Sequence, residues 1–311
     1  MGWGIDTILQ IIGLVETIFG LIPSVFIVTS NIQCWMKGEI PNSTDHIVTA
    51  LGFSGIFSAF NNAVMVFLVF SPEMPLLIYI LYTVCFTSVY TFCSSCWLTT
   101  CLCFIFFMKI INFKPGFFSW IKMKIDSLVP HLILAIEGLS ICLSVVYIIL
   151  YPCVKDVNST SSSMTNQTSY LLSPDYSTCV FMFGIFSIAI MVATITTGPI
   201  IVSLYKHTHR MRRNMGDGDG PSLKVYKRAA CTLSSLFILY IISYSLTIAG
   251  QLSNDKTLQW IYVIFSNSFP FLQSVILILG NSRLLQKCLE ILTKCRQCIY
   301  HKDGRVQTVG F

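Results

Sequence analysis

Seven long apolar runs constrain the fold of this 311-residue chain more than any other feature of its sequence. A helix needs about 20 predominantly apolar residues to cross a bilayer. Runs of that length cover residues 5–30, 47–70, 75–108, 128–151, 179–205, 229–251 and 258–281. The chain is 54% hydrophobic and only 11% charged, so its composition excludes an ordinary water-soluble globule. We therefore predict an all-α membrane protein built as a seven-transmembrane helix bundle.

Basic residues are divided unequally between the two sides of these runs. All but two of the 20 Lys and Arg residues lie in or beside the loops after runs one, three and five, or in the tail; the exceptions are Lys155 and Lys256. Because short cytoplasmic loops are enriched in Lys and Arg, we predict an extracellular N-terminus and a cytoplasmic C-terminus. Residues 1–281 are the predicted seven-helix domain. Residues 282–311 are a predicted short cytoplasmic tail with a juxtamembrane helix.

The most charged segment, residues 203–229, is predicted to be the third cytoplasmic loop. The helix of run five is expected to continue past the membrane until the Gly-Asp-Gly-Asp-Gly-Pro stretch breaks it, and a new helix starts at Ser222. The Gly216-x-Gly218-Asp219 pattern also occurs in intramembrane aspartyl proteases. Those enzymes need two aspartates at membrane depth, whereas both aspartates here lie in a charged loop. We predict that the protein is not an enzyme.

The loop at residues 152–178 is predicted to face the outside, and it carries candidate modification sites. Asn158 and Asn166 begin glycosylation sequons there, so we predict a glycan at one or both. A third sequon, at Asn42, is predicted to stay bare because it faces the cytoplasm. Cys153 and Cys179 bracket the loop; the alternatives for them are a disulfide in that oxidising compartment or two separate thiols.

Three stretches at the inner ends of the runs carry recognisable motifs. They are Trp-Leu-x-Thr with Met-Lys-Ile-x-Asn-Phe after run three, Ser-Leu-x-x-His-x-x-x-Met after run five, and Ser-x-x-Leu-Ile-x-x-Asn-x-Arg-Leu at the end of run seven. Together they resemble the bitter taste receptors, taste receptor type 2, along nearly the whole chain. The resemblance implies a G-protein-coupled receptor of the plasma membrane that senses bitter compounds and takes no cofactor.

The sequence departs from that family at three places in its spans. Run one reads Pro23-Ser24 where the family usually has Gly-Asn. Run two has Gly55 where the family usually has a buried Arg, and Gln273 stands where a His is usual. The Arg and the Asn belong to one polar network in the family, so both members are missing together. The departures leave open how runs one, two and seven are held to one another.

The resemblance also implies two functional regions. A small, partly apolar agonist is expected between the outer halves of the helices, where depth along the runs selects Asn62, Met65, Ser88, Phe92, Tyr240, Tyr244 and Val263. Run three contains no carboxylate, so an obligatory salt bridge to an amine is not expected there. A heterotrimeric G protein of the inhibitory or gustducin type is expected at the inner face, beside Lys109, His207, Met211 and Lys227. The alternative role for these basic residues is binding of anionic lipid head groups.

Two acidic residues near mid-bilayer, Glu16 and Glu137, keep two interpretations each. One is a counter-ion for a ligand or a proton site, and the other is a structural hydrogen bond to a neighbouring helix. Three other classes of function are less consistent with the sequence. Nucleic-acid binding is disfavoured because the chain has no continuous basic face. A transporter or channel would favour an inverted repeat, and a type 1 pheromone receptor lacks the motifs of runs three and five.

Overall fold

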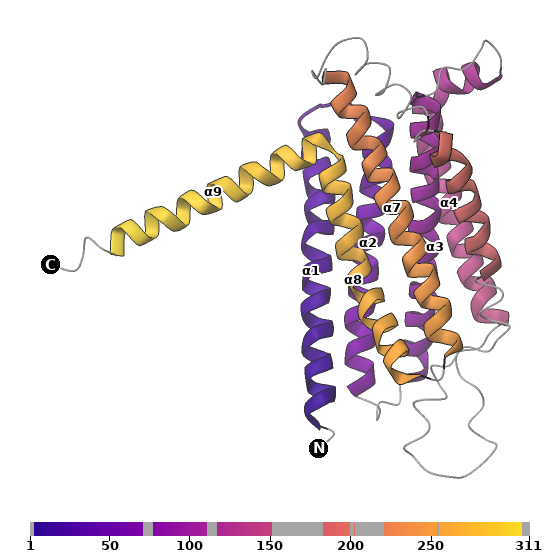
Figure 1. The fold of residues 1–311 in the computed structure, drawn as a ribbon, viewed down its shortest axis with the longest axis vertical. Coiled ribbons are helices and arrows are strands. Elements are labelled where there is room, and N and C mark those ends of the chain that lie inside the picture. Colours follow the sequence, from indigo (N-terminus) through magenta and orange to yellow (C-terminus); the bar gives the residue numbers. More distant parts are fainter. Residues whose placement is uncertain are drawn as a thin grey trace.

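The computed structural model describes the backbone of residues 3–70, 77–110, 117–150, 183–199, 202, 221–253 and 255–306. These residues form long helices, and all but the last of them stand side by side in a bundle (Figure 1). The helices are α1 (Trp3–Met36), α2 (Ser43–Phe70), α3 (Leu77–Ile110), α4 (Phe117–Leu150), α7 (Pro221–Leu252), α8 (Lys256–Gly280) and α9 (Ser282–Val306), with a shorter apolar helix at Phe183–Pro199. The all-α prediction is confirmed.

Six of the described helices are long and apolar enough to cross a membrane, and Phe183–Pro199 lies within the fifth predicted run. Several helices continue beyond the predicted spans: α1 ends at Met36 rather than near residue 30, and α4 begins at Phe117 rather than near residue 128. The added segments contain polar residues such as Asn31 and Asp126, which lower hydropathy without breaking a helix. Apolar length therefore located the spans but not the helix ends.

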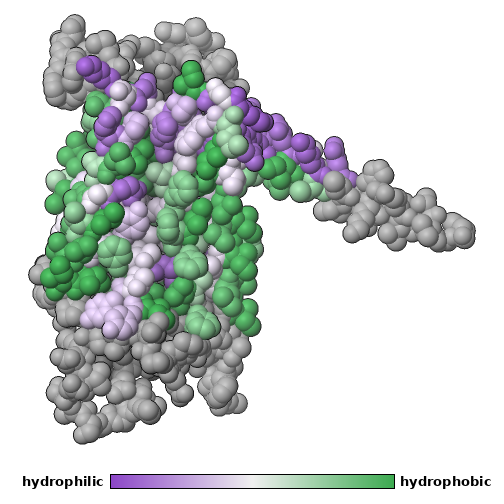
Figure 2. Space-filling view, turned by 180° about the vertical axis from the view of Figure 1, so that it is seen from behind, coloured by the Kyte–Doolittle hydropathy of each residue, from purple (hydrophilic) through white to green (hydrophobic). Residues whose placement is uncertain are grey.

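The first helical residues of α1 and the α8–α9 junction lie at opposite ends of the bundle (Figure 1). Following the charge asymmetry, we call the end with the α8–α9 junction the inner end and the opposite one the outer end. α9 projects sideways from the bundle at the inner end. Apolar side chains cover much of the bundle surface between the two ends, while hydrophilic side chains gather at the inner end and along one side of α9 (Figure 2).

Two clusters of buried side chains fill the bundle. The inner cluster is rich in leucine and isoleucine from α1, α2, α3, α4, α7, α8 and the start of α9. Ile27, Leu51, Leu102, Ile105 and Leu236 are among its fully buried members. The second cluster lies farther out and combines aromatic rings with small residues from α3, the 183–199 helix, α7 and α8. It contains the aromatic residues that the sequence assigned to ligand binding on α3 and α7.

Candidate functional site

Five aromatic residues from four helices pack together in the outer half of the bundle; we call them the outer aromatic cluster. Phe92 of α3 contacts Phe186 edge-on, with ring centroids 4.3 Å apart, and lies 6.4 Å from Phe269 of α8. Tyr240 and Tyr244, both on α7, pack against Phe269 at 5.2 Å and Phe186 at 6.3 Å. Edge-to-face pairs of this kind add about 0.5–1.5 kcal/mol each beyond area burial.

The hydroxyl group of Tyr240 links three helices at the inner edge of this cluster. The side chain is only 5% exposed. Its oxygen accepts a hydrogen bond from the Thr99 hydroxyl on α3 at 3.2 Å and one from the Gln273 amide on α8 at 3.3 Å. Because an unpaired polar group at this depth is costly, the three side chains hold one another in place. Movement of α7 relative to α3 would have to break this contact.

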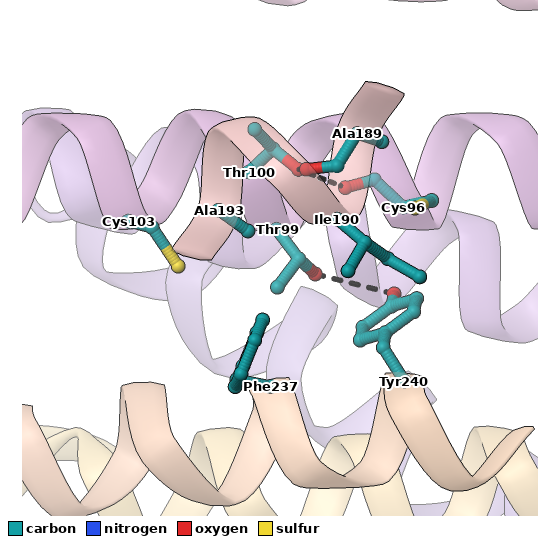
Figure 3. Close-up of a pocket in the computed structure, with 9 residues that line it drawn as sticks. All are labelled: Cys96, Thr99, Thr100, Cys103, Ala189, Ile190, Ala193, Phe237 and Tyr240. Atoms are coloured by element: carbon teal, nitrogen blue, oxygen red, sulfur yellow. Dashed lines mark hydrogen bonds between the residues drawn. The ribbon is translucent and has the colours of Figure 1, made fainter. Parts of the chain in front are cut away.

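A small cavity adjoins Tyr240 between α3, the 183–199 helix and α7 (Figure 3). Its volume is about 10 Å³, which is room for one water molecule at most. Thr99, Thr100 and Phe237 contribute to its walls, and the Thr100 hydroxyl bridges to the Ala189 carbonyl of the facing helix at 3.3 Å. An organic molecule would fit here only if side chains or helices moved.

Tyr244 ties the outer end of α7 to the 183–199 helix. Its hydroxyl shares a hydrogen bond of 3.0 Å with the Ser187 hydroxyl and lies 3.2 Å from the Phe183 carbonyl oxygen. Its ring also packs against the Phe183 ring, with centroids 5.4 Å apart. Tyr244 is only half-buried, in contrast to Tyr240.

The structure brings together only some of the ligand-binding residues chosen from the sequence. Phe92, Tyr240 and Tyr244 belong to the outer aromatic cluster. Ser88, one turn farther out on α3, accepts a hydrogen bond from Asn61 of α2 at 2.7 Å rather than from the chosen Asn62.

The remaining ligand-binding candidates lie on α2 and α8 and are not members of the outer aromatic cluster. Asn62 and Met65 are half-buried on α2, and the Asn62 amide nitrogen is buried without a protein partner among the described residues. Val263 lies on α8 and is 40% exposed. The sequence did not point to Phe186 and Phe269, because no local sequence motif distinguishes these two members of the outer aromatic cluster from the many other phenylalanines in the chain.

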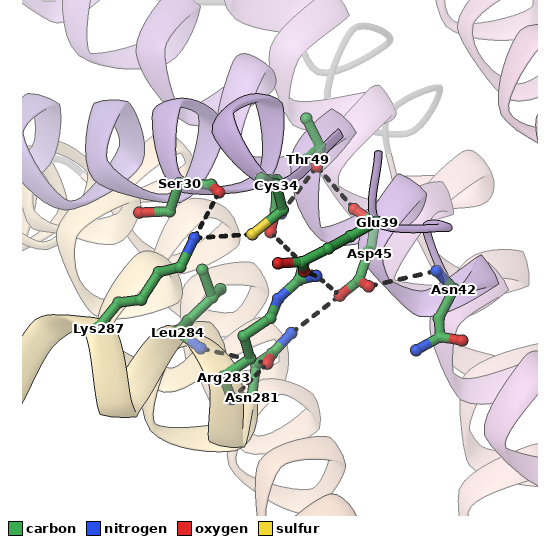
Figure 4. Close-up of polar contacts among 11 residues, drawn as sticks. Ser30, Cys34, Glu39, Asn42, Asp45, Thr49, Asn281, Arg283, Leu284 and Lys287 are labelled. Carbon is green, nitrogen blue, oxygen red and sulfur yellow. Dashed lines mark hydrogen bonds and ion pairs between the residues drawn. The ribbon is translucent and has the colours of Figure 1, made fainter. Parts of the chain in front are cut away.

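A group of charged and amide side chains joins α1, α2, α8 and α9 at the inner end; we call it the inner polar cluster (Figure 4). The Arg283 guanidinium of α9 donates to the Asn31 side-chain oxygen at 2.7 Å and lies 3.2 Å from a carboxylate oxygen of Asp45. Glu39 approaches the same guanidinium at 3.6 Å. Asn281 donates to Asp45 at 3.2 Å, and its side-chain oxygen accepts from the backbone N–H groups at the start of α9.

Burial separates the two acidic partners of Arg283. The Asp45 side chain is 7% exposed, whereas that of Glu39 is 54% exposed. An exposed ion pair contributes little, while removal of one partner of a buried pair is costly. Asp45 is therefore the partner that matters for stability. A second contact reinforces the junction, since the Lys287 ammonium group donates to the Ser30 carbonyl at 3.0 Å and to the Cys34 sulfur at 2.7 Å.

The structure describes few of the residues assigned to signalling and modification. Lys227 is exposed near the start of α7, and Lys109 lies at the end of α3, where only the backbone is described. The remaining predictions fall outside the described residues: His207, Met211, the sequons at Asn158 and Asn166, and the cysteines Cys153 and Cys179. Among the described residues, no three His, Cys, Asp or Glu side chains gather in a way that could hold a metal ion.

Comparison with known proteins decides which family this bundle belongs to. The family model for taste receptor protein (TAS2R) matches residues 1–296. This chain is a member of the TAS2R family. It is 28% identical over 309 residues to taste receptor type 2 member 7 of Rattus norvegicus, covering 95% of this chain and 97% of that protein. It is 27% identical to member 10 of Papio hamadryas (97% and 98% covered) and to member 8 of Homo sapiens (94% and 97% covered).

Membership identifies the chain as a G-protein-coupled bitter taste receptor in a membrane, and not as an enzyme. The resemblance found from the sequence motifs is thus confirmed.

Two of the departures from the family pattern, Ser24 and Gly55, lie close together in this receptor. The Ser24 hydroxyl of α1 donates to the Gly20 carbonyl at 2.9 Å and shares a hydrogen bond of 2.8 Å with Ser274 of α8.

Gly55 of α2 has no side chain, and this leaves room for the contact between Ser24 and Ser274. A Cβ atom at Gly55 would lie 2.7 Å from the Ser24 oxygen and 3.7 Å from that of Ser274. One turn away, a Cβ atom at Gly52 would lie 2.9 Å from a methyl group of Val28. Small residues let membrane helices approach closely and pack well. Close packing and one serine pair therefore join α1, α2 and α8 where the family usually has an Arg–Asn network.

Proposed function

We propose that small, mostly apolar bitter compounds bind this receptor at the outer aromatic cluster, next to Phe92, Tyr240 and Tyr244. The cluster offers aromatic faces and a few hydroxyl groups, which suits a neutral ligand with rings and one or two hydrogen-bonding groups. Asn62 and Ser88 on the neighbouring turns of α2 and α3 would supply further polar contacts, and Met65 and Val263 would extend the apolar wall. The observation that carries the proposal is the position of the Tyr240 hydroxyl. It joins the aromatic rings of this cluster to two polar side chains, Thr99 of α3 and Gln273 of α8.

The same contact suggests how binding would reach the inner face. The cavity beside Tyr240 is too small for an organic ligand, so an agonist must displace aromatic side chains to enter. Displacing Tyr240 breaks its bonds to Thr99 and Gln273, and α7 is then free to shift relative to α3. An agonist that binds the shifted arrangement better increases its population.

At the inner face, we propose that the shifted helices admit the C-terminal helix of the α chain of a heterotrimeric G protein. The proposed contacts are Lys109, His207, Met211 and Lys227, at the inner ends of spans three, five and six. The G protein is of the inhibitory or gustducin type. Replacing the last helix of that α chain with the one from another G-protein class tests this assignment, and an unchanged response after the exchange contradicts it.

A panel of bitter compounds, screened in cells with a calcium readout, supplies the agonist for the ligand-site test. Phe92→Ala and Tyr240→Ala are each expected to change the half-maximal agonist concentration by about tenfold or more, which corresponds to about 1.4 kcal/mol. Phe57→Ala is the matched control, because Phe57 lies on α2 with 51% of its side chain exposed. If both test variants respond as the unaltered receptor does, the pocket lies elsewhere.

A further inference from the structure

A carboxylate in the middle of the membrane is left without a role by the proposed pocket. Glu137 lies near the centre of the apolar stretch of α4, Lys124–Ile149. The Tyr90 hydroxyl donates to one of its oxygens at 2.7 Å, and the Ser94 hydroxyl donates to the other at 2.9 Å. Both donors lie one turn apart on α3, so the carboxylate faces the contact between α3 and α4.

These hydroxyl groups satisfy hydrogen bonds but supply no positive charge. Within the described part of the chain, the polar partners of Glu137 are these two hydroxyls and no basic side chain. A charged group at mid-bilayer is costly unless it is paired. The inner polar cluster shows the usual solution, since Arg283 faces the buried Asp45 there. Glu137 is an acceptor of the same kind, but among the described residues no cation faces it.

Burial along α4 places Glu137 at the border between protein and lipid. Leu134, three residues before Glu137, is 72% exposed, and Ile141, four residues after it, is 46% exposed. Ser140, three residues after Glu137, lies on the other side of Glu137 around the helix and is fully buried. Residues three and four apart share a helix face, so Glu137 separates a lipid-facing stripe from a protein-facing one. A Cβ atom at the neighbouring Gly138 would meet no atom within 4 Å, so the adjacent surface of α4 is open.

Aromatic rings lie on the α3 side of the same place. The rings of Phe86 and Tyr90 stack one turn apart, with centroids 6.5 Å apart and planes within 5°. Both side chains are half-buried. An ammonium group near the face of such a ring is attracted by the negative charge of the ring's π electrons. The surroundings of Glu137 thus combine a carboxylate, aromatic faces and open lipid-facing surface.

We infer that Glu137, with Tyr90 and Phe86, forms a binding site for lipophilic amines that reach the receptor through the bilayer. The ammonium group pairs with the Glu137 carboxylate, and the apolar part of the molecule lies along the exposed face of α4 beside Leu134 and Ile141. The site is separate from the outer aromatic cluster and does not depend on the proposed agonist pocket.

Direct binding to the full-length receptor in nanodiscs of zwitterionic lipid tests the site. Radiolabelled dodecylamine is the probe, empty nanodiscs give the lipid background, and unlabelled dodecylamine and dodecanol compete. In the unaltered receptor, dodecylamine is expected to displace the label at a concentration at least about tenfold lower than dodecanol, because only the amine forms the ion pair. Glu137→Gln keeps an oxygen for a hydroxyl donor but removes the charge, and it is expected to abolish this preference.

Glu16→Gln is the matched control, because Glu16 is the other carboxylate expected near mid-bilayer and accepts a hydrogen bond from Ser268 at 2.9 Å. It is expected to leave the preference for the amine unchanged. A monodisperse elution profile for each variant checks that it folds. The inference is overturned if the unaltered receptor binds no more amine than empty nanodiscs, or if Glu137→Gln retains the preference. Since the readout is binding and not signalling, the result is independent of where bitter agonists act.

Discussion

The inner half of this receptor packs around long aliphatic side chains and is closed by charged groups, whereas the outer half packs around aromatic rings joined by hydroxyl groups. Arg283 and Asp45 form an ion pair across the inner end, and Asp45 is nearly buried. Tyr240 and Tyr244 make the corresponding contacts farther out through single hydroxyl groups. Hydrogen bonds between membrane helices contribute only about 0.6 kcal/mol on average. The difference suggests an inner end that stays assembled and an outer half that can rearrange around a ligand.

The largest effect is expected from Arg283→Ala, which leaves Asp45 buried without its cation. We expect a loss of about 3 kcal/mol, at the low end for a buried pair because Arg283 keeps 27% exposure. The measurement is the melting temperature of the purified receptor. Lys294→Ala, an exposed change on the same helix, is the control and should have little effect. Equal melting temperatures for both variants would show that the ion pair does not hold the inner end.

A smaller loss is expected from Gly55→Ala, at the contact between α1, α2 and α8. The added methyl group meets the Ser24 oxygen at 2.7 Å, and such overpacking costs about 1–3 kcal/mol. Gly138→Ala adds the same methyl group to a surface with nothing within 4 Å, so it should be neutral or stabilising. The melting temperatures of the two variants are compared with that of the unaltered receptor. A Gly55→Ala variant that melts at the same temperature as the unaltered receptor would disprove the close contact.

Tyr240→Phe tests the outer half by removing a single oxygen atom. Thr99 and Gln273 lose their shared acceptor, and we expect a loss of about 1 kcal/mol in stability. If the contact restrains α7, the variant should also show raised signalling without agonist. The measurement is G-protein activation in the absence of ligand, normalised to receptor at the cell surface. Unchanged basal activity would show that the Tyr240 hydroxyl does not restrain α7. It would not contradict the packing of the Tyr240 ring.

The smallest effect is expected from Tyr244→Phe. Its hydroxyl contacts Ser187 on a half-buried surface, so we expect a loss of about 0.5 kcal/mol or less. Its melting temperature should lie between those of Tyr240→Phe and the unaltered receptor. A loss as large as that from Arg283→Ala would contradict the contrast between the two halves.

Prediction from sequence succeeded where one physical quantity decides the outcome. The bilayer fixes the length of an apolar helix, so the positions of the spans could be read from composition. Helix ends could not, because α4 begins at Phe117 in a segment where Lys and Asp mask the helix from a hydropathy criterion. The resumption of helix after the Gly-rich stretch agrees with α7, which begins at Pro221.

The functional sites were harder to predict than the spans. Depth along the helices selected Phe92, Tyr240 and Tyr244, which the structure brings together. Depth could not select Phe186 or Phe269. Whether a side chain faces a partner helix also depends on how its own helix is rotated about its axis. The Arg283–Asp45 pair was missed for a related reason: its members lie far apart in the chain, and neither carries a local motif that names the other.

The contact of Gly55 with Ser24 and Ser274 also limits how this receptor can change over time. A side chain larger than hydrogen at position 55 needs room that Ser24 occupies, so an arginine cannot be introduced there by a single substitution without disturbing α1. Ser24 and Gly55 therefore limit each other, because a substitution at one position changes which side chains the other can accept.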